Sequence, residues 1–323
     1  MQHCELVELG LQRVPRIEGS PDCMTGNLNK RGRGRTVCLL WPVLLVVVIA
    51  ALLVGCGPVE PAGDSGSSSA SKTARGTPAE ETADSGAHFS FMVCGDPQNN
   101  YAVFDRILAA ARSVDFLIIA GDLTGSGTPT EFGTFTEAMR NSGVRYYCVP
   151  GNHDVATGPA EQIYASYLGP THQSFDYQNS HFLLIDNSSP ELGFYPSERS
   201  WAAADLQAAR KRNPEHVIAV CHVPPGYPYS LNPAEAGARG EQANGSLAPV
   251  LSQGGVEELF CGHLHGYARE NDDGLPITIT GGAGAPLRMS AQNGGYYNYV
   301  LVRIDGRKLV QNVVRIDETG EGT

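Results

Sequence analysis

Five short apolar runs in this chain of 323 residues each lead into side chains that can bind a metal ion. The polar residues that follow the runs are Asp96 and Gln98, Asp122, Asn152 and His153, His222, and His263 and His265. Carboxylate and amide oxygens combined with imidazole nitrogens suit Zn, Fe or Mn better than Ca or Mg alone. These groups are too many for one tetrahedral ion. Two divalent ions about 3.5–4 Å apart would use them all, with a carboxylate such as Asp122 as a bridge.

The motifs differ in how strongly each one indicates a metal site. A Gly-Asp pair after a strand, as at Asp96 and Asp122, is by itself more often a turn. If their segment is extended, His263 and His265, two residues apart, are expected to direct their rings to one side. The sequence Gly151-Asn152-His153-Asp154 indicates a metal site more strongly, because three polar side chains in a tight turn have little use in a core. The metal interpretation rests on the order of all five motifs, each placed after an apolar run.

The elements that must position these residues alternate between strands and helices. Apolar runs predict strands over 89–93, 116–120, 144–149, 217–221 and 256–261, and further strands over 277–279, 296–304 and 309–316. Helical spacing predicts helices over 102–111, 132–139, 161–168 and 201–209. Such a pattern indicates an α/β domain with a second sheet. Since sites in open sheets form at the carboxyl ends of strands, the five motifs are expected to converge.

The motif order GD, GD, GNHD, H and GHxH closely resembles that of the calcineurin-like metallophosphoesterase family, over residues 88–316. The resemblance implies an α/β fold of two packed mixed β-sheets flanked by helices, a four-layer sandwich. It assigns the first metal to Asp96, Gln98, Asp122 and His265. It assigns the second metal to Asp122, Asn152, His222 and His263. It further implies hydrolysis of phosphate esters by a hydroxide bridging two divalent ions (Fe, Mn or Zn), with His153 as the general acid.

Two features depart from the patterns of the resembling proteins. Asp-Pro-Gln at 96–98 replaces the usual Asp-x-His, and the Gln98 carbonyl is a neutral and weaker donor than imidazole, which bears on the first metal. No Tyr follows Asp122 at three residues' distance, as it does in purple acid phosphatases, so a coloured tyrosinate–iron centre is not expected.

Arg288, after the Gly-rich stretch 281–284, is a candidate substrate contact. The alternative interpretation is a solvated Arg on a flexible turn.

Two rival functions remain open at the level of the sequence. One is a catalytically inactive metal- or phosphate-binding envelope lipoprotein, which Gln98 favours and an intact His153 opposes. The other is a nuclease of the same fold. From His88 onward the chain has 15 Lys and Arg against 25 Asp and Glu, which weighs against binding long polyanions. The expected partner is a small phosphoester, with specificity carried by loops 187–200 and 223–246.

The front of the chain predicts export and a membrane anchor. Four basic residues between Lys30 and Arg35 precede an uncharged apolar stretch over 37–54, and the stretch ends in Leu53-Val54-Gly55-Cys56. This end resembles the lipobox of bacterial lipoproteins, in which the Cys carries the lipid. A retained membrane helix and cleaved secretion are the alternatives, and Met24 is a more conventional start than Met1. The expected organisation is a signal region over 1–55, a lipidated flexible tether over 56–87, a metallophosphoesterase domain over 88–317 and a tail over 318–323.

The remaining cysteines and histidines of the domain are expected to have ordinary roles. Apolar surroundings predict small buried fillers, rather than a disulfide framework, at Cys94, Cys148, Cys221 and Cys261. Surface or core roles are predicted for His88, His172, His181 and His216.

Overall fold

The computed structural model of the chain describes residues 86–155, 159–229 and 244–316. The predicted signal region, Cys56 and the tether as far as Ser85 lie outside these residues. Among the helices of the described ranges, none combines the length and the apolar character needed to cross a membrane.

The first sheet has five strands in the order β11-β10-β1-β2-β3. They are β1 (His88–Cys94), β2 (Phe116–Ala120), β3 (Tyr146–Val149), β10 (Tyr297–Asp305) and β11 (Lys308–Ile316). β1, β2 and β3 run parallel to one another, and β10 pairs antiparallel with β1. The strands that precede Asp96, Asp122 and Asn152 therefore end at the same edge of this sheet.

The second sheet has six strands in the order β4-β5-β6-β7-β9-β8. They are β4 (Gln173–Tyr177), β5 (Ser180–Leu184), β6 (His216–Val220), β7 (Glu258–Cys261), β8 (Tyr267–Asp272) and β9 (Leu275–Thr280). β6 and β7 are parallel neighbours, so His222 and His263 follow adjacent strand ends. Each sheet mixes parallel and antiparallel pairs, as predicted.

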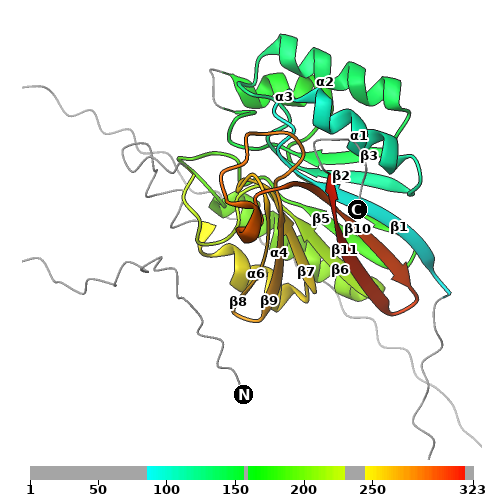
Figure 1. The fold of residues 1–323 in the computed structure, drawn as a ribbon. Coiled ribbons are helices and arrows are strands. Elements are labelled where there is room, and N and C mark those ends of the chain that lie inside the picture. Colours follow the sequence, from blue (N-terminus) through cyan, green and yellow to red (C-terminus); the bar gives the residue numbers. More distant parts are fainter. Residues whose placement is uncertain (1–85, 156–158, 230–243, 317–323) are drawn as a thin grey trace, which may run out of the picture. The chain divides into compact units, whose positions relative to one another are not determined.

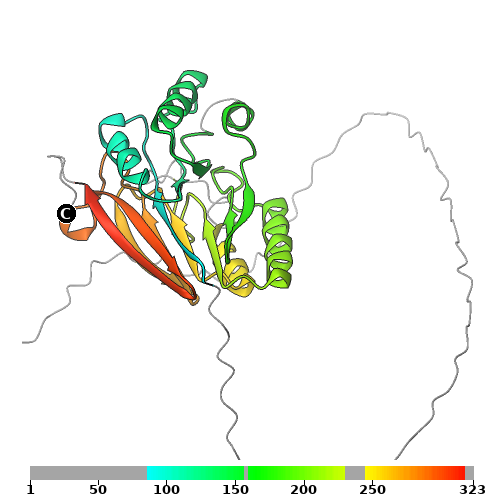
Figure 2. The same cartoon turned by 90° about the vertical axis from the view of Figure 1, so that its right-hand side faces the viewer.

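Helices cover the outer face of each sheet, which gives four layers (Figures 1 and 2). Three helices pack on the five-stranded sheet: α1 (Tyr101–Ala111), α2 (Pro129–Ser142) and α3 (Ala160–Leu168). Two pack on the six-stranded sheet: α4 (Pro196–Arg212) and α6 (Leu247–Gly254). A short 3-10 turn, η1 (Ala291–Asn293), precedes β10. The predicted α/β sandwich is confirmed.

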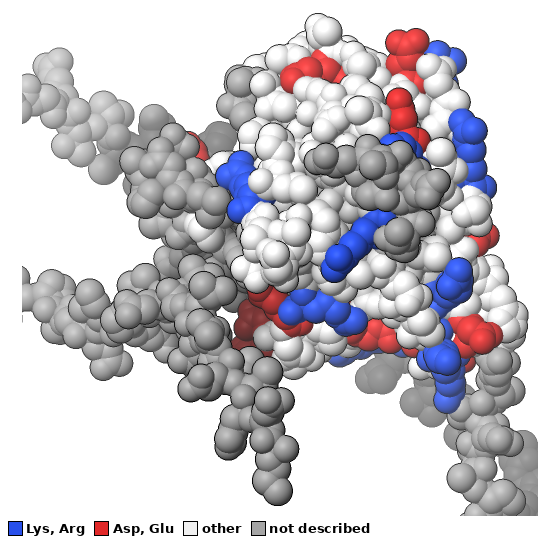
Figure 3. All heavy atoms as spheres, in the orientation of Figure 1, with Lys and Arg blue, Asp and Glu red and all other residues white. Residues whose placement is uncertain are grey.

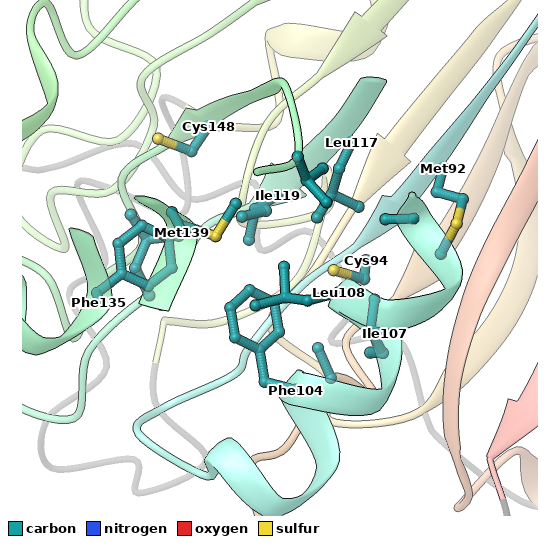
Figure 4. Close-up of a cluster of buried hydrophobic side chains, with 14 of the residues drawn as sticks. Met92, Cys94, Phe104, Ile107, Leu108, Leu117, Ile119, Phe135, Met139 and Cys148 are labelled. Carbon is teal, nitrogen blue, oxygen red and sulfur yellow. The ribbon is translucent and has the colours of Figure 1, made fainter. Parts of the chain in front are cut away.

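Three apolar cores hold the layers together. Between the sheets, Phe91 stacks on Phe116 with ring centroids 5.3 Å apart and meets Phe182 edge to face at 5.2 Å. Beneath α1 and α2, Phe104 and Phe135 point toward the sheet, with Cys94 and Cys148 in the same cluster (Figure 4). Cys221 and Cys261 lie in the third core, beneath α4 and α6. All four cysteines are free and buried, as predicted.

Several elements were not predicted from the sequence. β4 and β8 are edge strands whose side chains are mostly exposed or half-buried, so they carry no apolar run. β5 is only five residues long and buried along its whole length, which leaves no alternation to recognise. α6 is only eight residues long and contains Pro249, and its Leu247, Ala248 and Leu251 are fully buried. Burial against the sheet, rather than local propensity, accounts for this helix.

The four histidines outside the motifs each lie within 2.7 Å of a carboxylate oxygen. The pairs are His88 with Asp305, His172 with Glu198, His181 with Asp176 and Asp205, and His216 with Glu257. His216 is buried at the start of β6, away from the strand ends that carry the motifs. Burial lowers the pKa of His216, but hydrogen bonds to Glu257 and to the Gly306 carbonyl outweigh that effect and raise it above 6.5.

We expect Glu257→Gln to destabilise the protein in a pH-dependent way. A raised pKa means that the His216 interaction stabilises the fold fully below about pH 6.5 and is lost as pH rises through the folded-state pKa. Because Glu257 is partly exposed, the expected loss in the free energy of unfolding is about 1 kcal/mol at pH 5.5 and much less at pH 9. Chemical denaturation at both pH values, with Glu137→Gln as control, measures it. An equal loss at the two pH values would contradict the assignment.

Candidate metal centre

The backbone is left-handed at five of the seven predicted metal ligands. Positive φ angles occur at Asp96 (63°), Gln98 (39°), Asp122 (52°), His263 (72°) and His265 (43°). Non-glycine residues rarely adopt this conformation, and each instance costs on the order of 1–3 kcal/mol. Sharp turns of this kind re-aim side chains at the ends of strands. Their concentration at these residues indicates that the fold tolerates strain in order to bring the side chains together.

Two glycines permit the strand ends of both sheets to approach closely. A Cβ atom at Gly151 would lie 2.2 Å from the Oδ1 atom of Asp122. At Gly262 a Cβ would lie 2.5 Å from both the Ala120 carbonyl oxygen and the Oδ2 atom of Asp96. No other residue fits at such distances, which explains why glycine precedes Asn152 and His263.

The two oxygens of Asp122 face different groups of predicted ligands. Oδ1 lies 3.3 Å from the Nε2 atom of His222 and accepts the backbone N–H of His153 at 2.9 Å. Oδ2 accepts the side-chain amide of Gln98 at 2.8 Å. The side chain is only 1% exposed. Asp122 therefore lies between the two predicted ligand sets, with one oxygen directed to each.

Asn152, His222 and His263 form a compact donor set. The Oδ1 atom of Asn152 lies 3.0 Å from Nε2 of His222 and 3.1 Å from Nδ1 of His263, and these two nitrogens are 3.3 Å apart. Donor atoms that share an ion at bond lengths of ~2.1 Å lie about 3.0–3.4 Å from one another. The spacing of this set, together with Asp122, fits one divalent transition-metal ion.

Asp96, Asp122 and His265 form the other set, with donor atoms that all lie within 4.8 Å of one another. Asp96 Oδ1 is buried and accepts no hydrogen bond among the described residues, although His265 Nε2 lies 3.5 Å away. A buried carboxylate oxygen without a donor is costly unless a cation satisfies it. Gln98 extends toward the same space and lies 3.3 Å from His265 Nε2. This donor set also fits a metal ion.

Backbone carbonyls fix the orientation of all three imidazoles in these sets. His222 Nδ1 donates to Ala120 O at 2.8 Å, His263 Nε2 to Pro228 O at 2.8 Å, and His265 Nδ1 to Pro286 O at 2.9 Å. A carbonyl only accepts, so the bonded nitrogen carries the proton and the other nitrogen presents its lone pair to the centre. Metal-binding histidines are held in this way.

Burial and charge set the protonation of the centre. Burial lowers the pKa of both His263 and His265 to about 4, with a further contribution from the neighbouring charge of His222 at His263. These imidazoles are therefore neutral at pH 7, as ligands must be. Burial and the charge of Asp122 raise the pKa of Asp96 well above its usual range. Burial also raises the pKa of Asp122, but His222 and His153 outweigh it and lower it.

His153 lies beside the centre without joining either donor set. Its Nδ1 is 2.9 Å from the Gly125 carbonyl, and its Nε2 is 4.0 Å from Oδ2 of Asp122. The side chain is 36% exposed, whereas Asp122 is buried. The imidazole is thus open to a ligand that reaches the centre.

The Gly-rich stretch 281–284 packs against the Asp96 turn. The N–H groups of Ala283 and Ala285 donate to the carbonyls of Gly95 and Asp96. Its glycines permit this close packing, since a Cβ atom at Gly281 would lie 2.7 Å from Oδ2 of Asp96. The exposed Arg288 follows this stretch, and its Nε lies 3.2 Å from Nδ1 of His265. This contact places the Arg288 guanidinium next to the centre.

Two residues that hold the centre together were not predicted as site residues. Asp154 is fully buried and accepts the N–H groups of Leu123, Thr124 and Gly151, so it joins the loops after β2 and β3. It was visible as the last residue of the GNHD motif. Asn187 Oδ1 accepts the N–H of His222 at 3.0 Å. An isolated Asn in the long segment after β5 gives no signal in the sequence.

Comparison with known families agrees with this geometry. The family described as calcineurin-like phosphoesterase matches residues 89–267, which include all the predicted ligands. The chain belongs to the calcineurin-like phosphoesterases. The buried carboxylate and imidazole cluster of this calcineurin-like phosphoesterase is a fitting metal site.

Known proteins of several kinds are similar to this calcineurin-like phosphoesterase. Purple acid phosphatase 21 of Arabidopsis thaliana is 25% identical over 199 residues, which is 55% of this chain and 44% of that protein. A 3′,5′-cyclic-nucleotide phosphodiesterase of Nostoc sp. is 26% identical over 166 residues, 51% of this chain and 60% of the other. The purple acid phosphatase PPD1 of yellow lupin (Lupinus luteus) superposes with a TM-score of 0.58 at 15% identity, covering 71% of this chain and 52% of that one. The chain thus spans about half the length of these relatives, and the structural likeness concerns the fold alone.

We expect Asp154→Asn to destabilise the calcineurin-like phosphoesterase and to weaken its metal binding. The NH2 group of an Asn side chain would face at least one of the backbone N–H groups that now donate to Asp154. Two donors would then oppose each other, which lowers the free energy of unfolding by about 1–3 kcal/mol. The loops that carry Asp122 and Asn152 lose their common anchor. Chemical denaturation and metal titration measure the two effects, with the exposed Asp305→Asn as control. Unchanged stability would show that Asp154 does not hold these loops.

Proposed function

We propose that this calcineurin-like phosphoesterase hydrolyses small phosphate esters at a centre for two divalent metal ions. The observation that carries the proposal is the placement of buried Asp122, with one oxygen directed to each donor set. The residues that would hold the first ion are Asp96, Gln98, Asp122 and His265. Those that would hold the second are Asp122, Asn152, His222 and His263. Bound divalent ions supply Lewis acidity toward phosphoryl oxygens and activate water near neutral pH.

His153 is the candidate general acid for the leaving group. Its ring lies next to both donor sets, it is accessible, and neither set requires it as a ligand. A proton on Nε2 would face the centre, since Nδ1 is directed to the Gly125 carbonyl. Arg288 is the candidate contact for a substrate anion, because its guanidinium lies beside His265 at the rim.

The substrate class follows from charge and from the relatives. The face seen in Figure 3 carries both basic and acidic side chains, which lie side by side in its lower part, without a broad basic surface among the described residues. A small phosphoester needs no such surface, whereas a long polyanion does. Relatives named as phosphatases and as a cyclic-nucleotide phosphodiesterase support an ester substrate and are compatible with either monoesters or diesters.

We further propose that the enzyme is exported and anchored at the outer face of the membrane through a lipid on Cys56. The support comes from the sequence: a basic stretch, the apolar run 37–54 and the lipobox-like end Leu53-Val54-Gly55-Cys56. Residues 57–86 are rich in Gly, Ser, Pro, Ala and Thr, and the segment 56–87 would act as a tether of roughly 30 Å.

We expect about two equivalents of divalent metal in protein purified without chelator. Asp122→Asn should lose most of both, because both donor sets share this carboxylate. Elemental analysis measures the metal content, and Glu137→Gln, an exposed change on α2, is the control. A single tightly held ion in the wild-type protein would mean that Gln98 does not support the first site, and would overturn the two-metal proposal.

For His153→Ala we expect kcat to fall about 10²–10⁴-fold while the metal content stays nearly unchanged. The loss should be larger for alkyl phosphates, whose poor leaving groups need the proton, than for activated aryl esters. Steady-state kinetics on both ester classes checks this. A uniform loss would assign His153 to positioning or electrostatic work instead. Metal-loaded wild-type protein without turnover of any phosphoester would support the inactive binding protein.

For Cys56→Ser we expect loss of lipid attachment and either soluble or unprocessed protein. The reason is that the thiol is the attachment point in the lipobox-like sequence. Membrane fractionation and intact-mass spectrometry read out the anchor, and Cys38→Ser within the apolar run is the control. The same mass and the same membrane fraction for wild type and Cys56→Ser would refute the lipid anchor.

A further inference from the structure

The Glu131 carboxylate, in the first turn of α2, joins two loops that border the metal centre. Its Oε1 accepts the side-chain amide of Asn99 at 2.7 Å, and its Oε2 accepts the N–H and the hydroxyl of Thr128 at 3.0 and 2.8 Å. Gly125 also lies against this carboxylate, since a Cβ atom at Gly125 would be 3.2 Å from Oε1, and the Gly125 N–H helps to lower the pKa of Glu131. Glu131 therefore ties the turn after β1, next to Gln98, to the loop after β2.

The loop held by Glu131 in turn holds His153. The Gly125 carbonyl lies 2.9 Å from Nδ1 of His153 and can only accept, so Nδ1 carries a proton and Nε2 faces the centre. The other end of this loop is fixed, because Thr124 bonds to Asp154 and Gly127 packs against the Asp154 backbone. The position of the Gly125 carbonyl therefore depends on Glu131 on one side and on Asp154 on the other.

We propose that Glu131 is a positioning residue for His153, which it acts on through the Gly125 carbonyl. The inference rests on the proposed role of His153 as general acid. Glu131 fixes which ring nitrogen carries the proton and which nitrogen faces the leaving group. Asn99 secures the carboxylate from the other side and thereby links the orientation of His153 to the loop that carries Gln98.

Helix capping does not account for these contacts. Thr128 and Glu131 form a capping box at the start of α2, in which the side chain of each residue binds the backbone N–H of the other. No third residue takes part in a capping box. The bond from Asn99 and the contact with Gly125 come from outside the helix. Each group that faces the carboxylate is a donor, so a Gln at this position would set one N–H group against another.

The decisive variant is Glu131→Gln, compared with wild type in the full-length protein loaded with Zn²⁺, which is diamagnetic. The readout is the ¹⁵N resonances of the His153 ring in protein labelled with [¹⁵N]histidine, assigned by comparison with His153→Asn. In the wild type we expect the neutral ring to be in the Nδ1–H form, which leaves Nε2 to take up and deliver the acid's proton when the ring is doubly protonated. In Glu131→Gln we expect a substantial fraction of the Nε2–H form of the neutral ring, or a ring exchanging between orientations. Turnover of alkyl phosphates should fall about 10-fold or more, with KM and metal content little changed.

Two control variants separate positioning from helix stability. Thr128→Ala weakens the same cap and should lower the melting temperature, yet leave the Nδ1–H form of His153 in place. Glu137→Gln, exposed on the same helix, should change neither. A folded Glu131→Gln protein with the wild-type His153 resonances would overturn the inference. Because the resonances require no turnover, a wild-type protein inactive toward every phosphoester would overturn the proposed function without deciding this test.

Discussion

Two buried carboxylates, Asp96 and Asp122, constrain the whole arrangement of strand ends in this protein. Each is removed from water, and the charge of Asp122 raises the pKa of Asp96, so the pair is costly without positive charge between them. The structure brings them together nevertheless, through left-handed turns and glycines that permit contact between the sheets. A fold stabilised by its apolar cores alone has no need of this arrangement. It becomes favourable when divalent cations occupy the centre, and binding energy of that kind is also folding energy.

The imidazoles of the centre depend on backbone carbonyls rather than on partner side chains. His222, His263 and His265 each donate one ring N–H to a carbonyl, and His153 does the same to Gly125. These carbonyls orient the rings. Their hydrogen bonds raise the pKa of His263 and His265, but burial outweighs that effect and keeps both ligands neutral at pH 7. A hydrogen bond to a backbone carbonyl thus orients the rings of all three ligands and of the candidate acid. The four rings differ in their exposure.

The sequence allowed the predicted ligands to be placed together because each belongs to a local signal, an apolar run followed by a polar turn. Asp96, Asp122 and His263 all follow strands that the pattern of burial makes recognisable. The residues that hold these ligands could not be found in this way. Asn187 lies 35 positions from His222, and Glu131 reads as an ordinary capping residue. Their roles arise from hydrogen bonds between distant segments. The edge strands escaped prediction for a similar reason, since their pairing and not their composition makes them strands.

Gln98, which stands where the family usually has His, makes the two donor sets unequal in their readiness to bind an ion. Its amide group donates to Asp122 Oδ2 and points at His265 Nε2, two atoms that are expected to bind the first ion. To become a ligand itself, Gln98 must turn its carbonyl oxygen inward, which breaks both contacts and needs only a rotation of the amide about its last torsion. An ion in the first set would therefore compete with an internal hydrogen-bond donor and gain a neutral oxygen in exchange. The second set has no such competitor, because the nitrogens of His222 and His263 already present lone pairs to Asn152 and Asp122. In the two-metal centre proposed above, the second ion would therefore be held more firmly and the first would exchange more readily.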